Sequence, residues 1–233
     1  MVRGKIIYVT NPKEFGDKIS NLFIDTIVKC LSAKNQCFIA ISGGSTPVPV
    51  FKALVKKYEQ KTLKWSNVHV YSIDERCVPG DHPDNNFNSC YDIWLKYFPE
   101  INTHRIESWR RPSDAVKIYE NEINSLLYKK NGLPQFDLIF MGIGDDGHIA
   151  SLFPEYDFGS KKTSYVEDLN IKSKGVQRIT MTLPVLNNAK NRIIGVVGEK
   201  KKKIFADLLN SDYNNYPVAK LLSSNAHDIW VIN

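Results

Sequence analysis

The chain has 233 residues, of which 42% are hydrophobic and 24% are charged, as in an ordinary globular protein. This length fits one large α/β domain spanning residues 1–233. No apolar segment approaches the ~20 residues of a membrane helix, and the N-terminus lacks a signal-peptide core, so we expect a cytoplasmic protein without membrane association. The formal net charge is +6. Because the lysines are mostly dispersed and no recognition-helix pattern occurs, we expect a small anionic ligand rather than nucleic acid.

Strand-forming and helix-forming segments alternate along the chain. Continuous apolar runs predict strands at residues 6–9, 38–41, 68–73, 136–141, 178–182, 192–197 and 228–232. The intervening segments predict helices at residues 15–33, 47–58, 88–97, 113–128 and 201–209. This alternation is typical of an α/β fold with a doubly wound, mainly parallel sheet and helices on both faces, a Rossmann-like three-layer arrangement. The polar stretch 158–177 is predicted to be a mobile loop over the functional site.

The four cysteines show no metal-binding or redox motif. Cys30, Cys37, Cys77 and Cys90 lack both CxxC pairing and zinc-finger spacing. We expect reduced thiols, as is usual in the cytosol. Cys77 follows an arginine in a polar segment, which makes it a candidate for a thiol with a lowered pKa.

Ligands of doubly wound sheets bind beyond the carboxyl ends of the strands, so the residues after each predicted strand are the first candidates. The second strand leads to six residues before a helix: Ser42, Gly43, Gly44, Ser45, Thr46 and Pro47. Glycines permit a tight turn, hydroxyls suit helix capping, and free N–H groups at a helix start bind phosphate. A well-capped turn without a ligand is the alternative interpretation. The absence of a Walker lysine excludes a nucleotide P-loop.

The third predicted strand ends in Asp74, Glu75 and Arg76. Two acids and an arginine usually form a surface ion cluster. Their position directly after a buried strand favours a functional role instead. The turn-rich segment 82–88 that follows could simply cap the next helix.

The fourth predicted strand runs into a glycine-rich turn, residues 142–148, with the sequence GIGDDGH. The glycines satisfy the GxGxxG pattern of dinucleotide-binding loops, but Asp145 and Asp146 would lie where the negative pyrophosphate binds. We therefore favour catalysis by His148, which has a carboxylate two residues before it. A purely structural histidine is the alternative. No second histidine stands at ligand spacing, so no metal site is predicted.

Two basic residues farther along complete a candidate phosphate site. Arg178 opens a predicted strand, and Lys201 follows another in the sequence GEKK. A guanidinium can bind two phosphate oxygens, and an ammonium supplies a point charge. For the other lysines of the run 200–203, a solvated helix start is the expected role.

Together these segments resemble the 6-phosphogluconolactonases, in the superfamily that includes the glucosamine-6-phosphate deaminases. Five segments carry the resemblance, in the family's order and across essentially the whole chain: residues 41–47, 74–88, 141–154, 177–189 and 196–201. The resemblance implies a glucosamine-6-phosphate deaminase-like fold.

The residues after His148 distinguish the two activities within this superfamily. Deaminases share the DGHIA segment and continue with FNEP, whose glutamate orients the histidine, whereas this chain continues with SLFP. Phe153 occupies the glutamate's position, and an apolar ring cannot serve in a carboxylate relay. The SLFP ending and Arg76 are lactonase-like. The resemblance therefore implies hydrolysis of 6-phospho-D-glucono-1,5-lactone to 6-phospho-D-gluconate, in the oxidative pentose phosphate pathway, without a metal or cofactor.

The resemblance also suggests roles for the candidate residues. His148 would deprotonate water, oriented by Asp146 or Asp74, while Arg76 or backbone N–H groups of the turn 142–147 would receive the developing oxyanion. The phosphate would lie against the segment 42–46, clamped by Arg178 and Lys201. The enzyme could act alone, or it could be functionally coupled to glucose-6-phosphate dehydrogenase, which supplies the lactone.

Two other function classes fit the sequence less well. A serine nucleophile is disfavoured because Ser42 and Ser45 do not lie in a GxSxG elbow. A sugar-phosphate sensor without turnover usually carries a DNA-binding helix-turn-helix ahead of the sugar domain. The first predicted strand begins at about residue 6, so we expect no such module, and the intact set of Asp74, Arg76 and His148 favours an enzyme.

Overall fold

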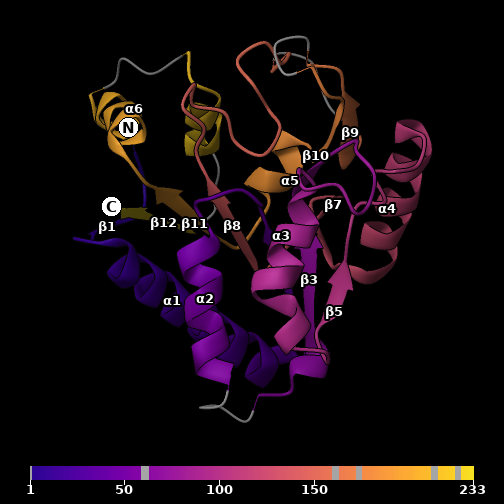
Figure 1. The fold of residues 1–233 in the computed structure, drawn as a ribbon, viewed down its shortest axis with the longest axis horizontal. Coiled ribbons are helices and arrows are strands. Elements are labelled where there is room, and N and C mark those ends of the chain that lie inside the picture. The colour runs from indigo at the N-terminus through magenta and orange to yellow at the C-terminus, as the bar shows by residue number, and fades with distance from the viewer. Residues whose placement is uncertain (1, 59–62, 159–162, 172–174, 211–214, 224–226) are drawn as a thin grey trace.

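The computed structural model describes residues 2–58, 63–158, 163–171, 175–210, 215–223 and 227–233. Its centre is a seven-stranded sheet with the order β1-β12-β11-β8-β2-β3-β5 (Figure 1). Every neighbouring pair in this sheet is parallel. The strands are β1 (Lys5–Tyr8), β2 (Cys37–Ile41), β3 (Val68–Ser72), β5 (Asn102–His104), β8 (Leu138–Gly142), β11 (Asn191–Val196) and β12 (His227–Ile232).

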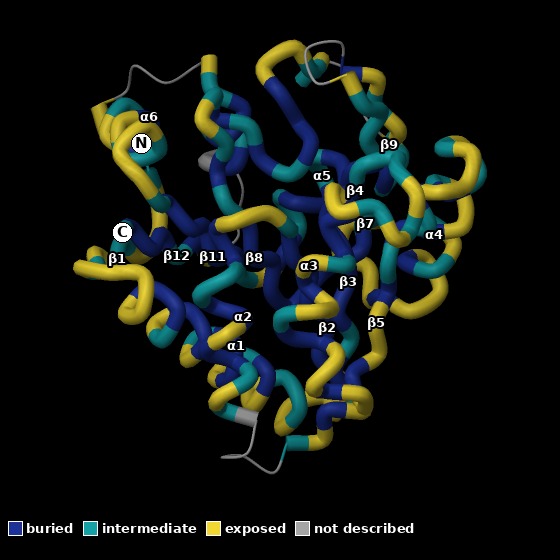
Figure 2. Tube along the Cα trace, viewed as in Figure 1, coloured by how far each residue is buried: buried dark blue, intermediate teal, exposed yellow. Residues whose placement is uncertain are grey.

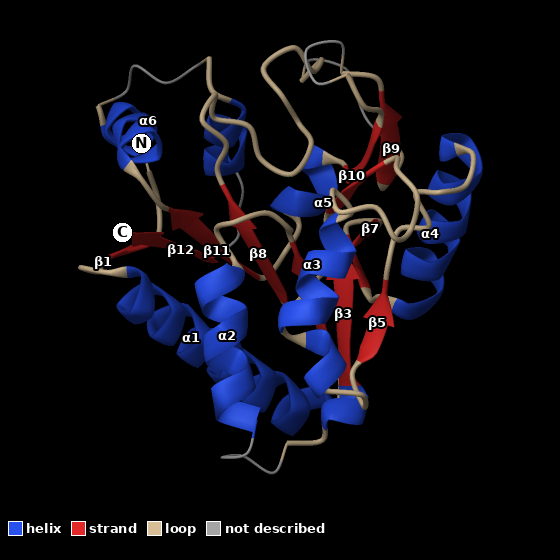
Figure 3. Cartoon of the chain, in the orientation of Figure 1, coloured by secondary structure: helices blue, strands red, loops and turns tan. Residues whose placement is uncertain are grey.

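Helices cover both faces of this sheet, which confirms the predicted doubly wound fold (Figure 3). One face is covered by α1 (Pro12–Lys34), α2 (Val48–Tyr58) and α3 (Asn86–Ile93). The other carries α4 (Pro112–Leu126), α5 (Leu183–Asn187) and α6 (Glu199–Leu209). Short 3-10 helices occupy Trp65–Asn67, Leu95–Tyr97 and Pro217–Ser223.

Alternating side chains of the strands produce these two cores. Along β2, Ile39 and Ile41 pack with α1 and α2, whereas Phe38 and Ala40 belong to the core on the opposite face. All five residues of β2 are buried, and the central strands are dark blue in Figure 2. Burial on both faces explains why the sequence shows continuous apolar runs here instead of alternation.

One predicted strand belongs to a different sheet. The segment expected at residues 178–182 forms β10 (Arg178–Met181), which lies between β4 (Asp74–Arg76) and β9 (Val166–Leu169) in a small antiparallel sheet. The prediction of a loop throughout 158–177 is therefore wrong for residues 166–169, which form β9. Residues 159–162 and 172–174 of that stretch lie outside the described residues. A two-stranded hairpin of β6 (Lys129–Lys130) and β7 (Leu133–Pro134) completes the strands.

The order of the strands places one crevice at the centre of the sheet. From β2 the chain proceeds outward to β3 and β5, whereas from β8 it proceeds to β11 and β12 on the other side. The boundary between β2 and β8 is therefore a topological switch point, where loops diverge and leave space for a ligand. Among the described residues, no helix has the length and apolar character needed to cross a membrane.

Candidate active site

A cleft of about 560 Å³ opens at the carboxyl ends of β2 and β8, at the switch point of the sheet. Its walls come from the loops after these strands, from the small sheet and from the start of α6. All candidate residues taken from the sequence line this one cleft: Ser42, Gly43, Gly44, Ser45, Thr46, Asp74, Arg76, Asp146, His148, Arg178 and Lys201.

The turn after β8 is tightly constrained by its own backbone. The N–H of Gly144 donates to the carbonyl of His148 (2.8 Å), and the N–H of Gly147 donates to the carbonyl of Gly144 (3.0 Å). Gly147 has a φ of +79°, a conformation that favours glycine. This closed turn brings the side chains of Asp146 and His148 to the same side of the loop.

His148 forms a short hydrogen bond with Asp146. The imidazole Nδ1 lies 2.5 Å from Oδ1 of Asp146, and the same oxygen accepts from the backbone N–H of His148 at 3.2 Å. An Nδ1–H that donates to this carboxylate leaves Nε2 as the proton-accepting nitrogen of the neutral ring. The ring of Phe153 lies against the imidazole, with centroids 4.3 Å apart. The ring is therefore held on one edge and one face.

Asp74 holds a different position in the cleft. Its Oδ2 accepts a hydrogen bond from Oγ of Ser151 at 2.6 Å, and the residue is buried. Burial raises the pKa of Asp74, while this hydrogen bond and the charges of Arg178, His148 and Arg76 act in the opposite direction. Of the two carboxylates that the sequence offered as partners for His148, the structure thus hydrogen-bonds Asp146 to it and engages Asp74 with a serine.

The space around the imidazole depends on glycine at position 144. A Cβ built on Gly144 would lie 2.0 Å from both Cε1 and Nδ1 of His148. Gly144→Ala is therefore expected to displace the ring from Asp146 and to lower kcat/KM by ~10²-fold, as a 1 Å misplacement can. Steady-state kinetics on the folded variant, checked by circular dichroism, measures this effect.

Gly132→Ala is the matched control. Gly132 lies on the β6–β7 hairpin with no atom within 4 Å of a built Cβ. Because position 132 has a φ of +79°, alanine is strained there, and the variant should lose some stability while keeping its activity. Equal activity of Gly144→Ala and Gly132→Ala would show that the imidazole position is unimportant.

Arg76 is fixed at the opposite wall by the segment 82–88. Its Nη1 donates to the carbonyl of Asp84 (2.7 Å) and to Oδ1 of Asn86 (3.1 Å). Behind it, the buried Glu75 accepts from three backbone N–H groups, those of Arg76, Asn86 and Phe87, at 2.7–2.8 Å. Burial nevertheless raises the pKa of Glu75 to about 7. Glu75 supports this wall and the start of α3, and it does not line the cleft.

Backbone and side-chain groups of the cleft differ in the hydrogen-bond donors that they could offer an oxyanion. The N–H groups of Gly144 and Gly147 are already used within the turn. Arg76 uses one guanidinium nitrogen for its contacts with the segment 82–88, and a guanidinium has five N–H donors. Arg76 is therefore better suited to receive a developing negative charge than these two backbone groups.

Two of the described residues that line the cleft, Ser42 and Arg178, have buried donors without a partner. Within the described part of the chain, Oγ of Ser42 and Nε of Arg178 are buried without a hydrogen-bond partner. Arg178 pairs in register with Arg76, and burial together with this neighbouring cation lowers the pKa of Arg178. Two adjacent guanidinium groups repel each other unless an anion lies between them. An anionic ligand would relieve this repulsion, and it could accept hydrogen bonds from Oγ of Ser42 and Nε of Arg178.

The segment 42–46 approaches the cleft closely because two of its residues are glycines. A Cβ on Gly43 would lie 2.6 Å from Cβ of Asn86, and Gly44 has a φ of +86°. The segment leads into α2, and Lys201 lies in the first turn of α6 across the cleft. Lys200, in contrast, is 79% exposed and pairs with Asp145 at 3.7 Å. Lys201 therefore lines the cleft, whereas Lys200 has the exposed side chain expected at a solvated helix start.

Cys77 differs from its prediction. Burial raises the pKa of Cys77 to about 11, and Asp168 and Glu75 act in the same direction. The prediction of a low-pKa thiol is therefore wrong, because the segment after Arg76 is half-buried and faces acids. At neutral pH, alkylation of Cys77 by iodoacetamide should be ~10²-fold slower than that of an unperturbed thiol, and its rate should rise with pH toward 11. Rapid alkylation at neutral pH, read by peptide mass spectrometry, would contradict this assignment.

The sequence assigned no role to Asn86 or Ser151, and it gave no indication that Phe153 packs on His148. Asn86 lines the cleft and joins Arg76 to the glycine segment, while its neighbour Asn85 caps α3 as the turn-rich pattern suggested. Ser151 binds Asp74 from a distant position in the chain. Phe153 was noticed only as a missing glutamate, and its packing on the imidazole has no signal in a single sequence.

The fold and the cleft define a doubly wound α/β protein that gathers a histidine–carboxylate pair and three cationic side chains, those of Arg76, Arg178 and Lys201, in one cleft. Residues 10–230 match the family described as "Glucosamine-6-phosphate isomerases/6-phosphogluconolactonase", and the chain belongs to that family.

Individual relatives agree with this assignment. A 6-phosphogluconolactonase of Synechocystis sp. is 33% identical over 213 residues, covering 89% of this chain and 86% of that protein. One from Haemophilus influenzae is 32% identical and covers 84% of each chain. In fold, the chain is similar to the solved 6-phosphogluconolactonase of Trypanosoma cruzi, with a TM-score of 0.87, 24% identity and coverage of 99% and 94%.

Proposed function

We propose that this chain hydrolyses 6-phospho-D-glucono-1,5-lactone to 6-phospho-D-gluconate, a step of the oxidative pentose phosphate pathway. The observation that carries the proposal is the hydrogen bond between His148 and Asp146, in a cleft that also holds Arg178 and Lys201. Membership of the family and relatives named 6-phosphogluconolactonase support the same substrate class.

In this proposal, His148 activates the attacking water. Its Nε2 takes a proton from water while Nδ1–H remains bonded to Asp146, whose carboxylate stabilises the resulting imidazolium. The hydroxide adds to the lactone carbonyl and forms a tetrahedral oxyanion. Collapse of this intermediate breaks the bond to the ring oxygen, which receives the proton from His148. One base therefore serves both halves of the reaction.

The cationic wall of the cleft supplies electrostatic stabilisation. Arg76 has N–H donors besides those used by Asp84 and Asn86, and these would face the oxyanion. A donor of this kind contributes ~3 kcal/mol to transition-state stabilisation. The phosphate would lie on the segment 42–46, between Arg178 and Lys201, so that binding energy far from the carbonyl orients the lactone.

Phe153 favours hydrolysis over deamination. It is buried, its ring packs on His148, and it holds the position where the resemblance places the deaminases' glutamate. A carboxylate relay through this position is absent, while the Asp146 contact that a water-activating base needs is present. The same geometry therefore supports a base without supporting ring opening of an amino sugar.

The roles given to His148 and Arg76 require no metal ion, so activity should persist in excess EDTA. A base and a cationic oxyanion donor supply both functions for which hydrolases often use a metal. Turnover measured before and after dialysis against the chelator tests this expectation, with a known zinc hydrolase as the positive control. Loss of activity that returns with added Zn²⁺ or Mg²⁺ would contradict the proposed mechanism.

Recognition of the phosphate provides the test of the substrate class. The phosphorylated lactone should have a kcat/KM at least ~10²-fold above that of unphosphorylated D-glucono-1,5-lactone, because charge-assisted contacts with Arg178 and Lys201 are then lost. Each hydrolysis rate is measured by acid release, corrected for spontaneous hydrolysis. Equal values for the two lactones would remove the phosphate site from the proposal.

The proposal also covers the location of the protein, its domain organisation and its coupling to another enzyme. We propose action in the cytoplasm, where the four free cysteines would remain reduced. Pairing of β1 with β12 joins both ends of the chain in one sheet and supports a single working domain. Coupling to glucose-6-phosphate dehydrogenase is a further proposal. It is supported by a 28% identical human protein named "GDH/6PGL endoplasmic bifunctional protein", of which this chain covers 28%.

A further inference from the structure

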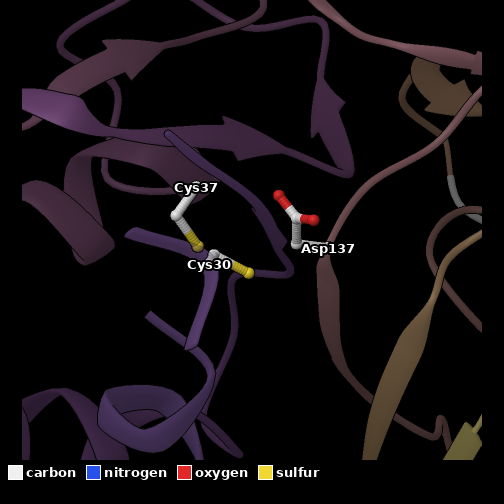
Figure 4. Close-up of side chains that lie close together, drawn as sticks. All are labelled: Cys30, Cys37 and Asp137. Carbon is white, nitrogen blue, oxygen red and sulfur yellow. The ribbon is translucent and has the colours of Figure 1, made fainter. Parts of the chain in front are cut away.

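Two thiols lie together at the end of the sheet opposite the cleft. Cys30 is in the last two turns of α1, and Cys37 is the first residue of β2 (Figure 4). Their sulfur atoms and a carboxylate oxygen of Asp137 lie within 4.8 Å of one another. Cys30 is partly exposed, whereas Cys37 is fully buried. Cys30 is thus the more accessible residue of the pair, and Cys37 belongs to the buried core.

The carboxylate in this cluster is already engaged. Oδ2 of Asp137 accepts from the backbone N–H of Phe38 (2.9 Å) and lies 2.7 Å from Nζ of Lys34, while Oδ1 lies 3.2 Å from Nζ of Lys190. Asp137 is therefore the anionic centre of a structural network that ties β2 to β8 and to the end of α1. It has little capacity left for another cation.

The local charge favours a thiolate over a metal ion. Two ammonium groups, those of Lys34 and Lys190, surround a single carboxylate, so a divalent cation placed here would meet a net positive environment. A negative sulfur would instead balance the excess. The hydrogen bond from Cys37 lowers the pKa of Cys30, and both lysines act in the same direction, while burial and Asp137 oppose them. The same hydrogen bond, together with burial, raises the pKa of Cys37, so Cys37 is the protonated member of the pair while Cys30 is reduced.

We propose that Cys30 and Cys37 form an oxidisable dithiol site that closes to a disulfide with peroxide. The Cys30 thiolate attacks one oxygen of hydrogen peroxide, which breaks the O–O bond and gives a sulfenic acid and hydroxide. The sulfur of Cys37 then displaces hydroxide from this sulfenic acid, and its proton leaves with that hydroxide as water. Overall, two thiols and one peroxide become one disulfide and two waters, a two-electron oxidation.

Peptide mapping of the oxidised wild-type protein tests the proposal directly. Trypsin cleaves after Lys29 and Lys34, which places the two cysteines on separate peptides. After treatment with hydrogen peroxide at neutral pH, these peptides should be recovered joined, with a mass about 2 Da below their sum, and dithiothreitol should separate them. Recovery of Cys30 as a sulfinic acid on an unlinked peptide would overturn the proposal. So would faster oxidation of Cys77 or Cys90.

Variants and a metal titration distinguish this site from its alternatives. Cys30→Ser should slow thiol loss by ~10-fold or more, because the buried Cys37 lacks an accessible partner. Cys77→Ser is the matched control, a partly exposed single cysteine whose replacement should leave the linkage intact. Titration with Zn²⁺ alone should give no tight binding. Stoichiometric zinc that protects both thiols from iodoacetamide, and is lost in Cys30→Ser, would establish a metal site and refute the dithiol.

Discussion

Replacing His148 with alanine is expected to lower kcat by ~10²-fold or more, with a change in KM of no more than about threefold. In the proposed mechanism the imidazole takes a proton from water through Nε2, while its Nδ1 is bonded to Asp146 at 2.5 Å. His148 is not one of the proposed phosphate contacts, so substrate affinity should change little. Initial rates over a range of lactone concentrations separate the two parameters.

His227→Ala is the matched control for this experiment. His227 is an exposed residue at the start of β12, and it does not line the cleft. Its variant should retain wild-type kinetics. Asp146→Asn should show an intermediate loss of kcat, because an amide cannot stabilise the imidazolium as a carboxylate does. Near-wild-type turnover of His148→Ala would mean that another group activates the water.

Replacing Arg178 with alanine should raise KM by ~10- to 10²-fold and lower kcat far less, as expected for loss of a charged phosphate contact. The side chain lines the cleft with an unpartnered buried Nε and stands beside Arg76 in register. Arg178→Lys keeps the charge but loses the planar fork, so its KM should fall between those of the wild type and the alanine variant.

A surface arginine controls for general effects of charge. Arg111 is 73% exposed and pairs with Asp114, so Arg111→Ala should leave both kinetic parameters unchanged. Inorganic phosphate should also inhibit the wild type competitively and inhibit Arg178→Ala much less. An effect of Arg178→Ala confined to kcat would remove this residue from the phosphate contacts and place it with the reacting carbonyl.

Most of the central sheet was predictable because its strands are buried on both faces. The apolar runs that became β2, β3, β8 and β11 suit a parallel sheet that is covered on both faces, and turn residues at their ends favour short strands over helices. The strand at Arg178 was also predicted, but its sheet was not. Local pattern reports that a segment is extended, whereas pairing with β4 and β9 is a long-range property.

The candidate site followed from the rule that polar residues after buried strands meet at one edge of the sheet. That rule gathers Ser42, Asp74 and His148 without stating which side chains touch. The choice of Asp146 as partner of His148 depends on the closed turn, and the bond between Asp74 and Ser151 joins residues 77 positions apart. The contact between Cys30 and Cys37 could not be predicted for a similar reason. The spacing of the two cysteines matches no motif, and their proximity depends on how the end of α1 packs beside the start of β2.

The most direct test of the account follows both activities of the superfamily in parallel. The lactone is generated in situ from glucose 6-phosphate and its disappearance is monitored, while glucosamine 6-phosphate is offered separately and ammonia is measured. We predict lactone loss well above the spontaneous rate, with no ammonia release. Ammonia release, or lactone loss at the spontaneous rate alone, would contradict the assignment of this cleft to lactone hydrolysis.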